Sequence, residues 1–167
     1  MKQEEGVGEA DTLLNIINNV TRHYQLPPND YIILIKRQPH KDYCTLFLTN
    51  CQSNFWFKKV NRPLLTQLRD TLRINSELPA FTRHLVTGLE QHSTVTIRDE
   101  EAVIEVDLAL GDGLVMNCKI DIPNQIKLSD SEKDFTTMLK IFLKQLYEAK
   151  EAQIDKTKAK WEKLPKQ

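Results

Sequence analysis

The sequence predicts an α+β protein: an antiparallel β-sandwich or partly closed barrel head with an inserted helical hairpin, followed by a long coiled-coil-like helix. Six short apolar segments, rich in β-branched and aromatic residues, alternate with turn-forming clusters at even spacing. After the third segment the apolar period becomes helical over residues 62–90, and then strand-like segments resume. From residue 129 helical spacing returns, without Gly or Pro until Pro165.

Length and composition favour one domain and give it no global charge that would attract a polyanion. The chain has 167 residues, of which 40% are hydrophobic. Its 23 basic and 23 acidic residues cancel, although acids gather near the N-terminus and lysines near the C-terminus. Three cysteines without a CxxC pair, with no signal peptide and no apolar run of transmembrane length, favour a reduced intracellular protein.

The head is expected to begin with an amphipathic helix over residues 11–26. Asp11 is a suitable cap, and Pro27-Pro28 would end the helix. One face of this helix would carry Leu13, Ile16, Ile17, Val20 and Tyr24.

Strands and a helical hairpin make up the rest of the predicted head. Asn61 and Pro63 form a helix start, and Gly111-Asp112-Gly113 is a strong β-hairpin signal. The strands are predicted at residues 31–37, 43–49, 54–60, 94–98, 103–110 and 114–122.

The longest helix signal covers residues 129–164 and divides the chain into a head, 1–128, and a helical dimerisation stalk, 129–167. Ser129 and Glu132 have the spacing of a capping box. Its first half is apolar nearly all round, so one side is expected to pack on the chain's own domain and another on a second copy. The alternative is an ordinary terminal helix lying along a monomer. The predicted dimer interface consists of Phe135, Met138, Leu139, Phe142, Leu146 and Ala149.

No motif for catalysis, cofactor binding or metal binding is present, which predicts a protein that is not an enzyme. His40, Cys44 and Cys51 could be imagined as metal ligands, but Cys44 alternates with leucines and is better explained as a small core residue. Trp56 could stack on a nucleic-acid base, but a ring facing the core of an alternating strand explains it better.

The lysines near the C-terminus are the one candidate nucleic-acid contact. A solvated helix end is the plain interpretation, and a weak, salt-sensitive contact with phosphates is the functional one. The residues concerned are Lys156, Lys158, Lys160 and Lys163.

The order of elements resembles the XLF/PAXX scaffold superfamily of non-homologous end joining, and within it the PAXX-like branch most closely. The similar runs are 44–50 (CTLFLTN), 55–57 (FWF) and 63–68 (PLLTQL), followed by the next helix and hairpin. The resemblance covers roughly residues 31–152 and lies in the order of elements more than in any single motif.

This resemblance implies a non-catalytic, nuclear, homodimeric scaffold of DNA double-strand break repair that bridges Ku and ligase complexes. Such scaffolds bind Ku through a disordered tail, and no residue here corresponds to it, so no Ku-binding residue is carried over. The predicted N-terminal helix also departs from the PAXX-like pattern. The centriolar cartwheel head domain is similar in shape, so a cytoskeletal or centriolar head-and-stalk module is the alternative function.

Overall fold

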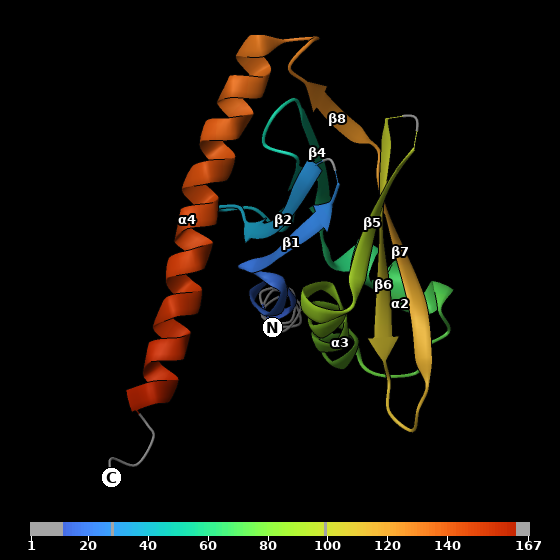
Figure 1. Cartoon of the computed structure of the whole chain (residues 1–167). Coiled ribbons are helices and arrows are strands. Elements are labelled where there is room, and N and C mark those ends of the chain that lie inside the picture. The colour runs from blue at the N-terminus through green and yellow to red at the C-terminus, as the bar shows by residue number, and fades with distance from the viewer. Residues whose placement is uncertain (1–11, 28, 99, 163–167) are drawn as a thin grey trace.

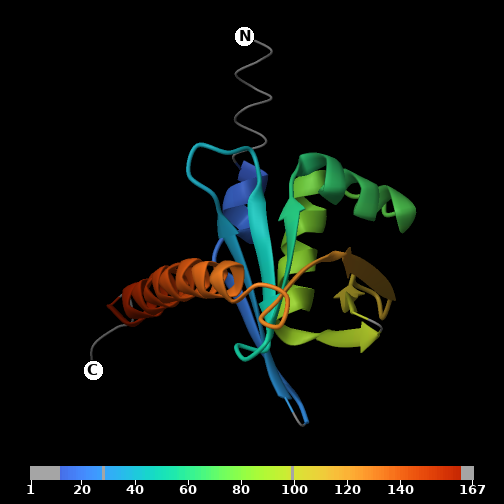
Figure 2. The ribbon, with the colours of Figure 1, turned by 90° about the horizontal axis from the view of Figure 1, so that it is seen from above.

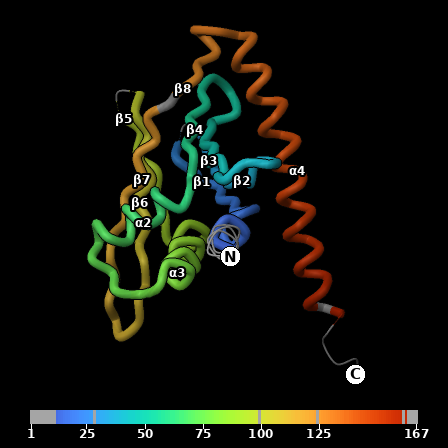
Figure 3. The backbone as a smooth tube through the Cα atoms, turned by 180° about the vertical axis from the view of Figure 1, so that it is seen from behind, coloured from blue at the N-terminus to red at the C-terminus, as the bar shows by residue number. Residues whose placement is uncertain are grey.

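The structure is a computed structural model, and it describes residues 12–27, 29–98 and 100–162. Within them the fold is α+β, as predicted, with two antiparallel sheets, a helical pair and a long C-terminal helix (Figure 1). The larger sheet lies between the smaller sheet and the long helix in all three views of the backbone (Figures 1, 2 and 3).

The five-stranded sheet has the order β1-β2-β3-β4-β8, with every neighbouring pair antiparallel. Its fifth strand returns from the far end of the sequence and pairs with β4 after the chain has built the second sheet. The strands are β1 (Val20–Leu26), β2 (Asn29–Arg37), β3 (Cys44–Thr49), β4 (Asn54–Val60) and β8 (Asn124–Lys127). The three central strands were predicted from the sequence, whereas β1 and β8 were not.

The predicted helix over residues 11–26 is wrong for most of its length. Among the described residues the helix covers only 12–17, and Val20–Leu26 is the edge strand β1. Asn19 has φ 67°, a left-handed conformation that asparagine tolerates and that ends the helix. The Asn18 side-chain oxygen then accepts a 2.8 Å hydrogen bond from the backbone of Arg37, which fixes the turn against β2.

The three-stranded sheet has the order β5-β6-β7 and confirms the predicted strands. Its members are β5 (Ser93–Arg98), β6 (Glu101–Ala109) and β7 (Val115–Ile122). Gly111 and Gly113 have positive φ, 96° and 75°, in the loop that joins β6 to β7.

The predicted helical hairpin is confirmed as α2 (Arg62–Thr71) and α3 (Leu78–Gln91). Asn61 caps α2 by accepting a 3.0 Å hydrogen bond from the backbone of Leu64. Helix α3 packs closely on β6, because Gly88 has no Cβ to hold the two apart.

The main core joins the two sheets, α2 and α3. Trp56 is 2% exposed there, and its Nε1 donates a 3.0 Å hydrogen bond to the carbonyl of Glu100, next to β6. The core interpretation of Trp56 is confirmed. Cys44 is also fully buried, with its thiol 3.6 Å from the carbonyl of Leu14.

Helix α4 (Glu132–Glu162) begins later than predicted and runs along the five-stranded sheet (Figures 1 and 3). Its cap is Ser131, whose Oγ accepts a 3.2 Å hydrogen bond from the backbone of Asp134, so the predicted box at Ser129 is shifted by two residues. The helix shares a second core with the sheet. The last predicted residues of this helix, 163 and 164, lie outside the described residues.

Candidate interaction site along helix α4

All six residues of the predicted dimer interface lie together, on the face of α4 that meets the chain's own sheet. Phe135 is 4% exposed, and Phe142 and Ala149 are fully buried, while Met138, Leu139 and Leu146 are partly buried beside them. Their partners are apolar residues on the side of the sheet that faces away from the main core, chiefly Leu34, Phe47 and Phe55.

This placement corrects where a second copy could bind. With α4 docked in this way, Phe142 and its neighbours are already covered by the same chain, so any interface formed through α4 has to use another face. The prediction that the protein dimerises through this helix is separate and stays a prediction.

A sparse apolar stripe runs along α4 beside the face that meets the sheet. Leu143, Tyr147 and Ile154 are 51%, 64% and 62% exposed, and their spacings of four and seven residues place them on one line. Ile141 is 42% exposed but lies two residues from Leu143, on a different side of the helix. We call Leu143, Tyr147 and Ile154 the outer stripe.

A groove runs between β1, the end of α3 and the second half of α4. Two adjoining hollows form it, with volumes of about 550 and 320 Å³, and both are lined by Glu90. We call it the α4 groove, and its polar lining is Thr21, Arg22, His23, Asn18, Asn19, Glu90, Lys150, Gln153, Lys156, Thr157 and Lys160.

Arg22 lines the hollow of the α4 groove that lies beside β1. Its Nη1 donates a 2.5 Å hydrogen bond to the backbone carbonyl of Glu90, and its guanidinium carbon lies 5.6 Å from the centre of the Tyr24 ring. Its Nε has no acceptor among the described residues. The guanidinium is therefore positioned by neutral groups, and no carboxylate among the described residues neutralises its charge.

Polar contacts set the width of the groove where α4 passes β1. Gln153 donates to the carbonyl of Asn19 at 2.9 Å and to the hydroxyl of Thr21 at 3.0 Å. The Lys150 ammonium donates to the same hydroxyl at 3.2 Å. These bonds fix this part of α4 beside β1.

The structure separates the lysines predicted to contact DNA. Lys156 and Lys160 line the α4 groove, whereas Lys158 lines a shallower hollow with Lys150 and Ile154. Within the described part of the chain, none of the three lies within 4.0 Å of a carboxylate. Lys163 lies outside the described residues. Sequence reasoning missed Arg22, which joins the groove from a strand that was predicted as helix.

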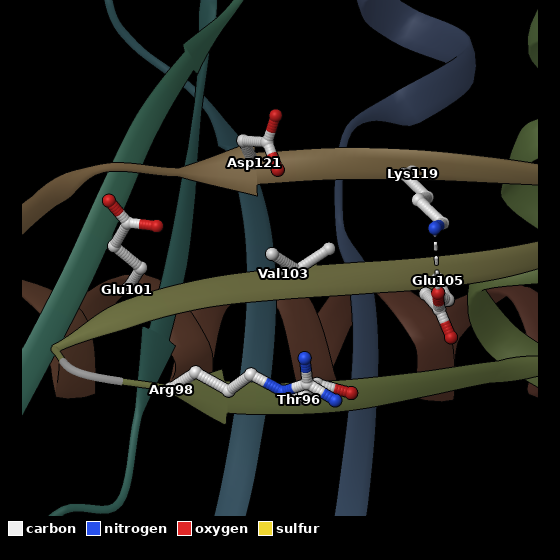
Figure 4. Close-up of a pocket in the computed structure, with 7 residues that line it drawn as sticks. All are labelled: Thr96, Arg98, Glu101, Val103, Glu105, Lys119 and Asp121. Atoms are coloured by element: carbon white, nitrogen blue, oxygen red, sulfur yellow. Dashed lines mark ion pairs between the residues drawn. The ribbon is translucent and has the colours of Figure 1, made fainter.

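A separate hollow, of about 390 Å³, lies on the solvent face of the three-stranded sheet (Figure 4). Glu105 and Lys119 face each other across β6 and β7 at 3.5 Å, and Val103 lies between the charged side chains. The solvent face of an antiparallel sheet commonly alternates in this way, and an exposed ion pair contributes about 0–1 kcal/mol. We therefore assign no ligand to this surface.

The described residues offer no cluster that could bind a metal ion. Clusters of three or more His, Cys, Asp or Glu residues that could hold a metal ion are absent from them. Burial raises the pKa of the Cys44 thiol to about 12, which leaves it un-ionised and a poor nucleophile. No helix among these residues is both long and apolar enough to span a membrane.

Comparisons with known proteins do not place the chain in a family. No protein-family model matches the sequence, and no curated protein matches it. The inference of function therefore depends on the surfaces of α4 and on the resemblance in element order.

Proposed function

We propose that the protein is a non-catalytic, homodimeric scaffold of nuclear DNA double-strand break repair by non-homologous end joining, which bridges Ku and ligase complexes. In this proposal the two sheets form a sandwich-like head, and α4 pairs with its copy in a coiled-coil-like dimer. The order of elements, with a helical hairpin between two groups of strands and a long helix after them, supports the resemblance that suggested this function.

The observation that carries the scaffold proposal is the outer stripe of α4. The sheet covers one face of this 31-residue helix, and Leu143, Tyr147 and Ile154 remain exposed on another. Apolar residues in a line on a helix favour pairing with a second apolar helix.

A second exposed apolar surface lies at the loop between β6 and β7. Leu114 and Val115 are 55% and 59% exposed there, next to the glycine turn. A two-fold dimer presents every such surface twice, so one scaffold can hold two partners and gain avidity from their linkage. This arrangement supports bridging by protein contacts rather than by chemistry.

The oligomeric state tests the proposed interface. Light scattering after size exclusion should give a dimer for the native chain and a monomer for Leu143→Glu with Tyr147→Glu, because burying charge in an apolar interface is costly. The matched control is Ile141→Glu, an exposed position outside the stripe, which should stay dimeric. A native chain that is monomeric at all accessible concentrations would remove the dimer from the proposal.

The end-joining role needs a separate experiment. Joining of linear DNA should be measured in a nuclear extract depleted of the endogenous protein, with the native chain or the Leu143→Glu, Tyr147→Glu variant added back. We expect only the dimeric form to restore joining and to co-purify with the ligase complex. If the native dimer restores nothing and captures no end-joining factor, the cytoskeletal or centriolar head-and-stalk module becomes the better proposal.

A further inference from the structure

We propose that the α4 groove binds an acidic peptide segment of a protein partner, with apolar residues between its carboxylates. This site does not depend on the end-joining proposal, since it follows from the side chains that β1, α3 and α4 bring together. The groove combines uncompensated positive charge with apolar lining residues. The charge favours carboxylates in the occupant, and the apolar residues favour apolar side chains between them.

The charge of the groove is strongly one-sided. Among the described residues, four cationic side chains line it, Arg22, Lys150, Lys156 and Lys160, against one acidic residue, Glu90. Arg22 and Lys150 donate only to neutral oxygens, and Lys156 and Lys160 form no ion pair with any other described residue. Carboxylates placed here would form charge-assisted hydrogen bonds without displacing an existing partner.

The floor of the groove is apolar at both ends. Ile32 and Leu146 lie beside Arg22 and Lys150, and Ile16, Val86 and Ala152 lie beside Lys156 and Lys160. Such a floor can bury aliphatic or aromatic side chains of a peptide. The sugar-phosphate backbone of a nucleic acid has no comparable group to place against it.

The layout of charges also disfavours a continuous polyanion. Glu90 lines both hollows, so this residue lies where they meet, between the two groups of cations. Lys150 and Lys156 are six residues apart, or about 9 Å along a helix. An extended peptide rises about 3.3 Å per residue, so it would place acidic residues about three positions apart with an uncharged residue near Glu90.

Fluorescence anisotropy with a defined probe tests the site. The probe is a fluorescein-labelled decapeptide in which pairs of glutamates alternate with leucines, titrated with the full chain at low and physiological salt. We expect saturable binding that weakens as salt increases, because the charges at the rim are screened. No binding at low salt would overturn the proposal.

Two double variants, each of which removes two lysine charges, show where on the protein the probe binds. Lys156→Gln with Lys160→Gln should weaken binding about tenfold, as expected when two charge-assisted contacts are lost. Lys140→Gln with Lys144→Gln removes the same charge from an exposed part of α4 outside the groove, and affinity should stay within about twofold of the native value. Equal losses in the two double variants would show non-specific attraction and overturn the proposal.

A gain of affinity separates a binding role from a structural one. Glu90→Gln removes the only acidic side chain among the described residues that line the groove, so the acidic probe should bind several-fold more tightly. The circular dichroism spectrum should be unchanged, because the Arg22 contact uses the backbone carbonyl of Glu90. Unchanged or weaker probe binding would contradict the proposed position of the occupant.

Two further experiments test whether DNA or the chain's own N-terminus occupies the groove instead. A labelled DNA duplex that binds more tightly than the peptide, with the same dependence on Lys156 and Lys160, would reassign the groove to nucleic acid. Probe binding that appears only after Glu4, Glu5 and Glu9 are changed to Gln would assign the groove to the chain's own acidic N-terminus. Either result would overturn the partner-peptide proposal.

Discussion

The Phe142 ring packs against the Phe55 ring, with centroids 5.5 Å apart and planes inclined by 67°. The centroid of the Phe47 ring lies 6.1 Å from that of Phe142, so strands β3 and β4 both contact this one side chain of α4. The long helix is thereby part of the folded unit, and its docking can be tested separately from its pairing with a second copy.

Phe142→Ala should lower the free energy of unfolding by about 3–5 kcal/mol, the usual effect of truncating a fully buried phenylalanine. The matched control is Ile141→Ala, the preceding residue, which is 42% exposed and should change stability by about 0.5 kcal/mol or less. Urea unfolding followed by circular dichroism measures both. Equal effects of the two changes would mean that α4 does not dock on the sheet through Phe142.

Gly88→Ala should destabilise the protein, although alanine favours helix by about 1 kcal/mol over glycine. A Cβ at this position would lie 2.5 Å from a methyl group of Val106 and 2.9 Å from the carbonyl oxygen of Asp107, so α3 or β6 must move. We expect a net loss of about 1–3 kcal/mol in the free energy of unfolding. Thr87→Ala, at the exposed neighbouring position, is the control, and a higher melting temperature for Gly88→Ala would contradict the close packing.

The central strands and the helical hairpin were predictable because each has one clear period and a local start or stop signal. The segment 54–60 matches β4 residue for residue, and Asn61 with Pro63 marks the start of α2. Local sequence signals were sufficient to predict these elements, because the tertiary packing favours the same secondary structure at these positions.

The edge strand β1 was not predictable from spacing alone. Val20 and Tyr24 are four residues apart, and this separation fits one face of a helix and one face of a strand equally well. The pairing of Tyr24 with Tyr31 across β1 and β2 decides the outcome, and it depends on the partner strand. Asn19, with its left-handed φ, was the local signal that could have ended the helix earlier.

The sequence showed that α4 has an apolar seam but did not show what covers it. Phe47 and Phe55 point to the face of the sheet opposite Leu46 and Trp56, so this sheet is apolar on both faces and needs cover on both. The α4 groove was even harder to predict from the sequence, because Arg22 and Lys156 are far apart in it and no motif connects them.

Tyr24→Phe should lower the free energy of unfolding by about 0.5–1.5 kcal/mol, the usual net value of one hydrogen bond. The Tyr24 hydroxyl lies 2.5 Å from Ser93 Oγ, which also donates a 2.6 Å hydrogen bond to the carbonyl of Leu89. This buried chain of bonds joins β1 to the α3–β5 connection. Tyr147→Phe is the control, since that hydroxyl is exposed and bonded to Glu151, and its unfolding midpoint should not change. A neutral Tyr24→Phe would mean that the buried bond contributes nothing.

The three thiols should differ in reactivity according to their burial. Cys44 and Cys118 are buried and Cys51 is exposed, so a thiol reagent at pH 8 should modify one cysteine in the native protein and three after unfolding. Rapid modification of more than one native thiol would show that the core opens on the time scale of the reaction.

Stability should also fall at high pH because of Cys44. Burial raises the pKa of its thiol from 9.0 to about 12, partly offset by the nearby charges of Arg37 and Lys36. The unfolded thiol therefore loses its proton above pH 9 while the folded one keeps it. This thiol's contribution to stability is complete below pH 9 and is lost as pH rises from 9 towards about 12.

Denaturation at a series of pH values should show a shallower alkaline decline in stability for Cys44→Ala than for the native chain. The slopes should differ by up to about 1.4 kcal/mol per pH unit, and Cys51→Ala, at the exposed position, should change the slope less. Identical slopes for Cys44→Ala and the native chain would mean that the thiol is accessible to water.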